Sequence, residues 1–132
     1  MTRLMQRGVA GVVTDGGFRD SPGIGTLDIR AYHRRPSAPT NLILHQAVEI
    51  NGPIGCGGVP VFPEDVVVGD DEGVVVIPAE IAEEVAAEAT EMTEFEDFVL
   101  ERVQAGASII GLYPPTDPKT KKDFEAWRKR RR

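Results

Sequence analysis

Short apolar runs separated by turn-forming residues occupy the first 80 residues of the chain. Residues 9–13 form an apolar run that contains β-branched residues and is soon followed by Asp15-Gly16-Gly17. This pattern predicts a buried strand whose C-terminal end leads into a tight turn. Further runs predict short strands at residues 29–33, 41–50, 54–56, 59–62, 66–68 and 74–77. This spacing favours one compact β-rich unit over repeated βαβ crossovers.

Glycine, proline and aspartate mark the connections between these strands. Residues 22–27 predict a turn or a short helix, and Asn51-Gly52 is a strong hairpin signal. The glycine cluster 55–58 lacks the Lys-Ser/Thr ending of a phosphate-binding loop, so a turn is preferred there. Turn chemistry is likewise preferred over a second metal site for three aspartates, Asp65, Asp70 and Asp71.

The hydrophobic period changes after Pro78 to steps of three and four residues. Residues 79–104 therefore predict an amphipathic helix that ends at Ala105-Gly106, and Thr90–Thr93 marks where it could break. Residues 1–7 predict the last turns of another helix, with Gly8 as its C-cap.

The end of the chain predicts one more helix. Residues 108–112 suggest a single turn, and residues 113–118, with three prolines, suggest a stiff linker. Residues 119–129 then predict an amphipathic helix with Phe124 and Trp127 on one side.

Composition places the chain among ordinary globular proteins. Its 132 residues allow one domain at most, with 41% hydrophobic and 27% charged residues. No apolar run approaches the roughly 20 residues of a membrane span, and the N-terminus lacks a signal-peptide core, so a cytoplasmic location is expected. The single cysteine, Cys56, agrees with a reducing compartment. His33 and His45 lack a metal-type spacing and are expected to be packing or surface residues.

The net charge of -6 conceals a division between body and tail. Residues 117–132 hold eight Lys and Arg against three Asp and Glu, giving +5, and the remainder holds seven against eighteen, giving -11. An acidic body argues against general nucleic-acid binding, and the basic tail alone is only weak evidence for it.

The neighbouring charges Arg19 and Asp20 are the first candidate for chemistry. On an irregular segment both side chains can point into one cleft, whereas on a regular strand they would face opposite ways. A guanidinium can grip a substrate carboxylate with two parallel hydrogen bonds. A carboxylate can hold a hydrated hard cation such as Mg²⁺.

The pair belongs to a longer motif, Gly-Val-x-Gly-Val-Val-x-Asp-Gly-x-x-Arg-Asp, over residues 8–20. This motif resembles the signature of the RraA-like family, which contains class II 4-hydroxy-4-methyl-2-oxoglutarate and 4-carboxy-4-hydroxy-2-oxoadipate aldolases and proteins named as regulators of ribonuclease activity. Residues 61–78 resemble a second family block, with Glu64 in place of the glycine of its usual Pro-Gly-Asp turn. The resemblance runs from residue 1 to about Tyr113.

The resemblance implies an α/β fold with a β-rich core of short strands and flanking helices, a swivelling β/β/α-type domain lacking its N-terminal part. We expect residues 1–113 to form the C-terminal portion of an RraA-like domain. Residues 114–132 would add the Pro-rich linker and a basic amphipathic helix.

The same resemblance implies roles for four residues. Arg19 would clamp the substrate carboxylate, and Asp20 would bind Mg²⁺, Mn²⁺ or another divalent cation directly. Asp15 would orient Arg19, or else act in turn chemistry by bonding its own backbone beside a positive-φ Gly16. Glu96 would reach the metal-bound water of a neighbouring subunit, or else be a solvated helix charge.

The implied reaction is the metal-dependent cleavage of 4-hydroxy-2-oxo acids to release pyruvate, with oxaloacetate decarboxylation as a side activity. Two alternatives stay open: a protein-binding regulator of ribonuclease activity, and an inactive truncated family member. The implied assembly is a homotrimer or hexamer, and the apolar faces of the two C-terminal helices are expected to be exposed for such contacts. No membrane partner is expected.

Overall fold

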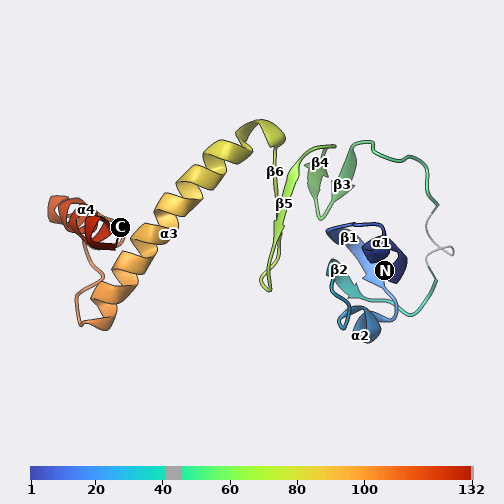
Figure 1. The fold of residues 1–132 in the computed structure, drawn as a ribbon, viewed down its shortest axis with the longest axis horizontal. Helices are drawn as coiled ribbons and strands as arrows, with labels where there is room; N and C mark the ends of the chain where they lie inside the picture. The colour runs from blue at the N-terminus through green and yellow to red at the C-terminus, as the bar shows by residue number, and fades with distance from the viewer. Residues whose placement is uncertain (41–45, 132) are drawn as a thin grey trace. The chain divides into compact units, whose positions relative to one another are not determined.

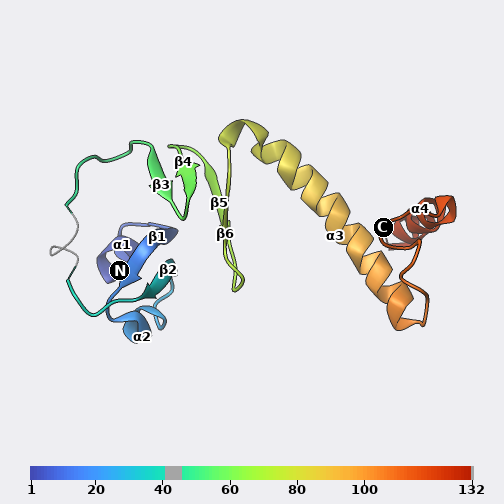
Figure 2. The same ribbon diagram turned by 180° about the vertical axis from the view of Figure 1, so that it is seen from behind.

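The computed structural model describes residues 1–40 and 46–131 (Figures 1 and 2). The chain divides into two units, Met1–Glu80 and Ile81–Arg132, and each is described by itself. The first contains α1 (Thr2–Gln6), β1 (Gly11–Phe18), α2 (Ser21–Ile24), β2 (Arg30–Pro36), β3 (Ile54–Cys56), β4 (Val59–Val61), β5 (Val66–Gly69) and β6 (Val74–Ile77). A 3-10 turn, η2 (Ala79–Ile81), precedes the helices of the second unit, α3 (Ala82–Gln104) and α4 (Pro118–Arg131). The expected mixture of short strands and flanking helices is confirmed.

β1 and β2 form a parallel pair connected through α2. The register runs from Gly11 opposite Arg30 to Phe18 opposite Pro36, and it shifts between Thr14 and Gly17. The prediction that Asp15-Gly16-Gly17 ends the strand in a tight turn is therefore wrong, because β1 continues through these residues as a bulge. Gly17 permits this path, since a Cβ there would lie 2.6 Å from the Cβ of Ser37.

β1 is half-exposed, which corrects the prediction of a buried strand. Its residues alternate between exposed and partly buried, and Val13 is 38% exposed. Within the described part of the first unit β1 and β2 pair only with each other, so that no further strand covers their outer edges.

β3 and β4 form a hairpin around Gly57 and Gly58. Both glycines have positive φ, +62° and +85°, as a two-residue type I′ turn requires, and the expected turn at 55–58 is confirmed. The hairpin predicted at Asn51-Gly52 is wrong: Asn51 has φ +60°, but residues 46–50 form no strand. Ile50 there is 93% exposed, and β3 pairs with β4 instead. The rest of the predicted strand, residues 41–45 with His45, lies outside the described residues.

The turn from β4 to β5 contains the residue that departs from the family pattern. The Asp65 N–H donates to the Phe62 carbonyl at 3.2 Å, and the Phe62 N–H donates to Asp65 Oδ2 at 2.8 Å. Glu64 occupies the third position with φ +78°, which is the left-handed conformation that a type II turn demands after proline.

β5 and β6 form an antiparallel hairpin close to β2. At its tip Asp70 Oδ1 accepts hydrogen bonds from the N–H groups of Glu72 and Gly73, at 2.8 and 3.1 Å. This is the turn chemistry expected of Asp70. Gly69 is the last residue of β5 before this tip, and it lies against Tyr32 of β2. A Cβ on Gly69 would come within 2.7 Å of the tyrosine ring.

α3 is one continuous helix, so the break considered near Thr90–Thr93 is wrong. The Oγ1 atoms of Thr90 and Thr93 donate to the carbonyls of Ala86 and Ala89, at 2.8 and 2.9 Å, and the helix accommodates both bonds. The predicted ends of α1 and α3 are confirmed. Gly8 and Gly106 follow them with φ +78° and +90°.

The core of the second unit is aromatic. Four hydrophobic residues are buried, Phe98 and Val99 on α3 and Phe124 and Trp127 on α4, and Phe95 and Leu112 pack against them. The Trp127 indole N–H donates to Glu101 Oε2 at 2.6 Å. The expectation that the Phe124/Trp127 face is exposed for subunit contacts is therefore wrong, because α3 covers it. No helix in the described ranges has the length and apolar character needed to cross a bilayer.

Candidate functional site

Arg19 and Asp20 lie at the junction between β1 and α2. Asp20 takes φ +58°, which turns the backbone out of the strand, and the next three residues begin α2 with Pro22 in its first turn. Arg19 Nε and Asp20 Oδ2 are 3.2 Å apart. The two side chains are 54% and 74% exposed, so both can be reached from solvent.

The pair lines a hollow of about 770 Å³ in the first unit. Its walls come from α1, the end of β1, α2 and residues 37–40. Leu4, Ile24 and Leu27 supply apolar surface, and Thr14 and Ser37 supply hydroxyl groups. A hollow of this size, lined by apolar surface together with charged and hydroxyl groups, suits a small polar molecule. The structure thus brings Arg19 and Asp20 together in one cleft, as their irregular segment predicts.

Asp15 makes a contact that neither interpretation of its role anticipates. Its Oδ2 accepts a hydrogen bond from the Gly57 N–H at 3.2 Å, which joins β1 to the β3–β4 turn 42 residues away. The turn-chemistry interpretation is wrong, because the Gly16 N–H donates to Thr14 Oγ1 at 3.0 Å and Gly16 has no positive φ. Thr14, which sequence reasoning missed, performs this local role. In the described structure Asp15 forms neither a hydrogen bond nor an ion pair with Arg19.

The donor set at Asp20 fits a hydrated divalent cation. Mg²⁺ in proteins usually binds one or two carboxylates, keeps several waters and takes substrate oxygens in its other positions. Asp20 offers an exposed carboxylate, of which Oδ2 faces Arg19. Among the described residues no group of three or more His, Cys, Asp and Glu side chains is gathered that could hold an ion by itself. A single carboxylate shared with substrate is therefore the arrangement that these residues fit.

Glu96 belongs to the second unit. It lies on α3, where its Oε1 accepts a hydrogen bond from the Tyr113 hydroxyl at 3.2 Å, and it is exposed. Its role toward a neighbouring subunit stays a prediction.

His33 and Cys56 occupy structural positions. The His33 ring stacks on Phe18 with centroids 5.0 Å apart, and its Nδ1 lies 2.6 Å from the Arg35 carbonyl oxygen. This is the packing role expected of His33. Cys56 is partly buried at the end of β3, next to the glycine turn.

The fold and the site define a member of a known class. Residues 1–76 match the family model of RraA-like proteins, described as Aldolase/RraA, and the chain belongs to this family. The chain is 38% identical over 105 residues to an uncharacterised protein of Methanocaldococcus jannaschii, covering 78% of this chain and 49% of that protein. It is 41% identical over 71 residues to a Halalkalibacterium halodurans protein named as a candidate 4-hydroxy-4-methyl-2-oxoglutarate aldolase, covering 54% of this chain and 33% of the relative. The chain thus spans half or less of the length of these curated relatives.

Two solved structures share the fold. An uncharacterised protein from Pseudomonas syringae pv. tomato matches with a TM-score of 0.78 over 85% of this chain and 56% of its own, at 23% identity. Streptomyces coelicolor RraAS2, described as an unusual member of the RNase ES inhibitor RraA protein family, matches with a TM-score of 0.62 and 31% identity. That match covers 76% of this chain and 52% of RraAS2.

Proposed function

We propose that the protein is a divalent-metal-dependent aldolase that cleaves 4-hydroxy-2-oxo acids, such as 4-hydroxy-4-methyl-2-oxoglutarate, and releases pyruvate. The observation that supports this most is the Arg19–Asp20 pair, accessible to solvent and lining a hollow of small-molecule size. Membership of the RraA-like family and the name of the H. halodurans relative support the same reaction class.

Each residue of the pair has a distinct task in this proposal. When the C3–C4 bond breaks, the C4 hydroxyl loses its proton and becomes a carbonyl, and an electron pair is left on C3. The neighbouring keto group takes up this pair as an enolate, which gains a proton at C3 to give pyruvate. Mg²⁺ or Mn²⁺ held by Asp20 would supply Lewis-acid stabilisation of that charge. Arg19 directs Nε toward Asp20, which leaves its terminal nitrogens for the substrate carboxylate. Fixing the carboxylate also fixes the plane of the keto acid.

Oxaloacetate decarboxylation follows from the same chemistry. Loss of its C4 carboxylate as CO₂ generates the same pyruvate enolate, so a site that stabilises the enolate serves both reactions. We include Glu96 in the proposal as a residue that acts from a neighbouring subunit in a homo-oligomer, and Asp15 as a residue that positions the end of β1.

Pyruvate release from 4-hydroxy-4-methyl-2-oxoglutarate, measured with Mg²⁺ and with EDTA, tests the proposal. We expect Asp20→Ala to lose activity by about 100-fold or more, as removal of a main electrostatic stabiliser does. Arg19→Lys keeps the charge but loses the bidentate grip, so its KM should rise. Asp28→Ala is the matched control, because Asp28 is an exposed aspartate on the same connection that does not line the hollow.

Two outcomes would contradict the proposal. Full metal-dependent activity in Asp20→Ala would exclude this site. A folded wild-type chain that binds neither Mg²⁺ nor pyruvate would favour an inactive family member.

A ribonuclease regulator is the second candidate, favoured by the likeness to RraAS2. Its test is inhibition of a purified RNase E-type ribonuclease by the wild-type chain and by Asp20→Ala. Inhibition that Asp20→Ala leaves unchanged, without pyruvate release, would establish this function instead.

A further inference from the structure

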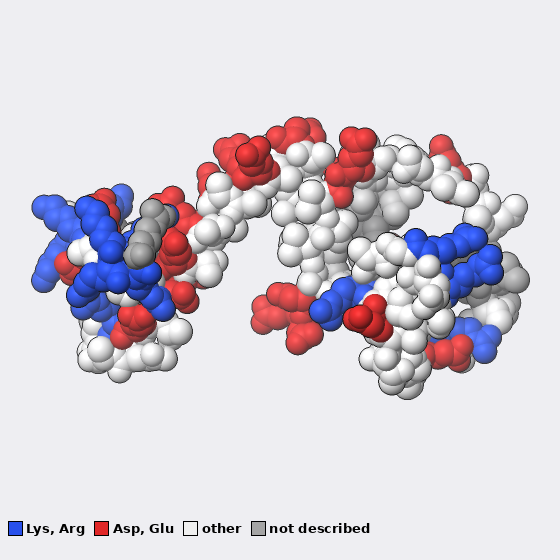
Figure 3. All heavy atoms as spheres, viewed as in Figure 1, with Lys and Arg blue, Asp and Glu red and all other residues white. Residues whose placement is uncertain are grey.

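The solvent face of α4 is a second candidate site, separate from the Arg19–Asp20 hollow. The helix holds seven Lys and Arg against two Asp and Glu, giving +5 over 14 residues. Figure 3 shows these cations gathered over α4. By contrast α3 holds eight Asp and Glu against one Arg, giving -7 over its 23 residues.

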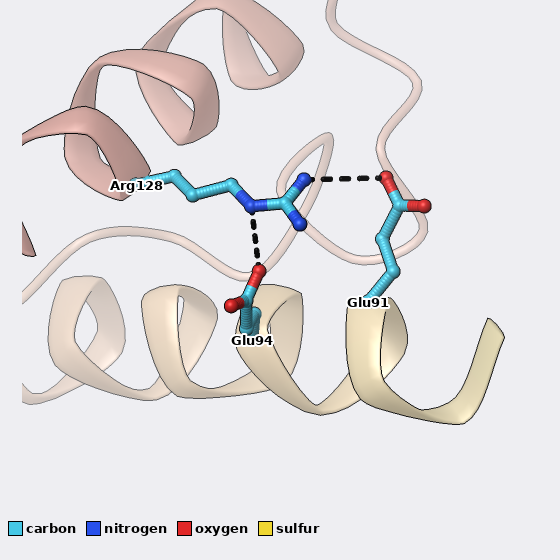
Figure 4. A network of polar contacts seen from close by, with 3 residues as sticks. All are labelled: Glu91, Glu94 and Arg128. Carbon is cyan, nitrogen blue, oxygen red and sulfur yellow. Dashed lines mark ion pairs between the residues drawn. The ribbon is translucent and has the colours of Figure 1, made fainter. Parts of the chain in front are cut away.

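Two of the α4 arginines are engaged with α3. Arg128 Nε lies 2.6 Å from Glu94 Oε2, its Nη1 lies 3.9 Å from Glu91 Oε1 (Figure 4), and the Nε and Oε2 atoms are shielded from solvent. Arg131 pairs with Glu101 at 3.4 Å and lies over the Trp127 ring at 4.6 Å. These contacts neutralise part of α3 and hold α4 in place with its aromatic residues inward.

Four exposed cations remain on the solvent side of α4, and we call them the α4 ridge: Lys119, Lys122, Lys129 and Arg130. Lys121 is also exposed, but it lines a hollow that includes Glu88 and Glu91 of α3. Within the described residues none of the ridge cations forms an ion pair. The helical repeat of 3.6 residues places Lys122 and Lys129 opposite the buried Phe124 and Trp127. Asp123 and Glu125 lie on the same helix, so the ridge has a local net charge of about +2 over a length of roughly 16 Å.

The types of side chain on the α4 ridge indicate which kind of partner it would bind. An interfacial membrane helix needs apolar side chains that can enter the bilayer, and here Phe124 and Trp127 are buried against α3. The same burial leaves no aromatic ring on the ridge for stacking on bases. A row of exposed cations on a helix, with the aromatic rings of that helix buried, matches a row of closely spaced phosphates. A duplex presents one negative charge per ~1.7 Å of its axis.

We propose that the α4 ridge binds the phosphate backbone of nucleic acid without reading its sequence. The acidic remainder of the chain argues against binding elsewhere on the molecule, but its field is screened within about 8 Å at physiological salt. Binding is therefore local to α4 and strongly salt-dependent.

Fluorescence anisotropy with a labelled 20-base-pair DNA duplex tests the proposal on the full chain. With about two phosphates neutralised, a plot of log K against log salt should have a slope of about -2. Lys122→Glu/Lys129→Glu should weaken binding by about 10-fold or more and flatten the slope. Arg3→Glu/Arg7→Glu makes the same change in net charge at exposed positions, one in α1 and one at its C-cap, and should change binding by about 3-fold at most.

Circular dichroism monitors the helices of each variant. If the charge reversal unfolds α4, Lys122→Gln/Lys129→Gln replaces it, with a smaller but still selective loss expected. Absence of duplex binding by the wild-type chain at low salt would overturn the proposal, as would equal weakening by the α1 control. Tighter binding of poly-glutamate than of the duplex would overturn it in favour of an acidic protein partner.

Discussion

The turn at Glu64 allows a direct test of whether a left-handed backbone conformation at a non-glycine residue destabilises the first unit. An L-residue in the left-handed region costs about 1–2 kcal/mol relative to its preferred conformations, because its Cβ approaches the carbonyl oxygen. Glu64 has φ +78° and follows Pro63 in a turn closed by Phe62 and Asp65. Glycine is free of this strain, because it has no Cβ.

Glu64→Gly should therefore stabilise the first unit. Relief of the strain contributes about 1–2 kcal/mol, and the greater freedom of glycine in the unfolded chain offsets about 0.5–1 kcal/mol of it. The net gain is about 0.5–1 kcal/mol in the free energy of unfolding. For a unit of about 80 residues this raises the Tm by roughly 4 °C.

Thermal unfolding followed by circular dichroism measures the shift, and hydrogen exchange at the β5 and β6 amides locates it. Glu64→Ala is the control, since alanine removes the charge but keeps the Cβ and its strain. If the glycine and alanine variants are equally stable, the charge of Glu64 rather than its backbone is responsible, and the strain argument fails.

Two further substitutions test the packing of each unit. Trp127→Ala should destabilise the α3–α4 unit by about 3–5 kcal/mol, since it removes a buried indole and its hydrogen bond to Glu101. Urea unfolding followed by α-helical circular dichroism should show a lower midpoint. An unchanged midpoint would contradict the described core. Gly17→Ala should destabilise the β1–β2 pair by about 1–3 kcal/mol, because the new Cβ would meet the Arg35 carbonyl oxygen at 2.8 Å. The control is Gly23→Ala in α2, which should not be destabilising because its Cβ meets nothing within 4 Å. Equal unfolding midpoints for the two variants would refute this account of the bulge.

Local patterns predicted the elements whose cause is local. The period of three to four after Pro78 predicted α3, and the two short runs of consecutive valines predicted the strands β5 and β6. Gly8 and Gly106 marked helix ends because only a residue without a Cβ adopts their φ easily.

Two of the errors, at the end of β1 and on the apolar side of α4, share one physical origin, which is contact between distant segments. Asp15-Gly16-Gly17 has the composition of a turn, but Gly17 lies against β2 and Asp15 bonds Gly57, 42 residues away. Periodicity identified the apolar side of α4 without indicating that α3 would cover it. At the site, the neighbouring positions of Arg19 and Asp20 sufficed to predict their proximity, because no long-range contact was needed.

The burial of Trp127 means that the tryptophan fluorescence of the chain comes from the second unit alone. Trp127 is the only tryptophan in the sequence, and it is held between Phe98, Phe124 and the carboxylate of Glu101. Its emission spectrum therefore monitors the α3–α4 hairpin. The hollow at Arg19 belongs to the first unit, which contains no tryptophan whose emission a bound keto acid could quench. A fluorescence titration can thus assign a bound molecule to one half of the chain without any added label.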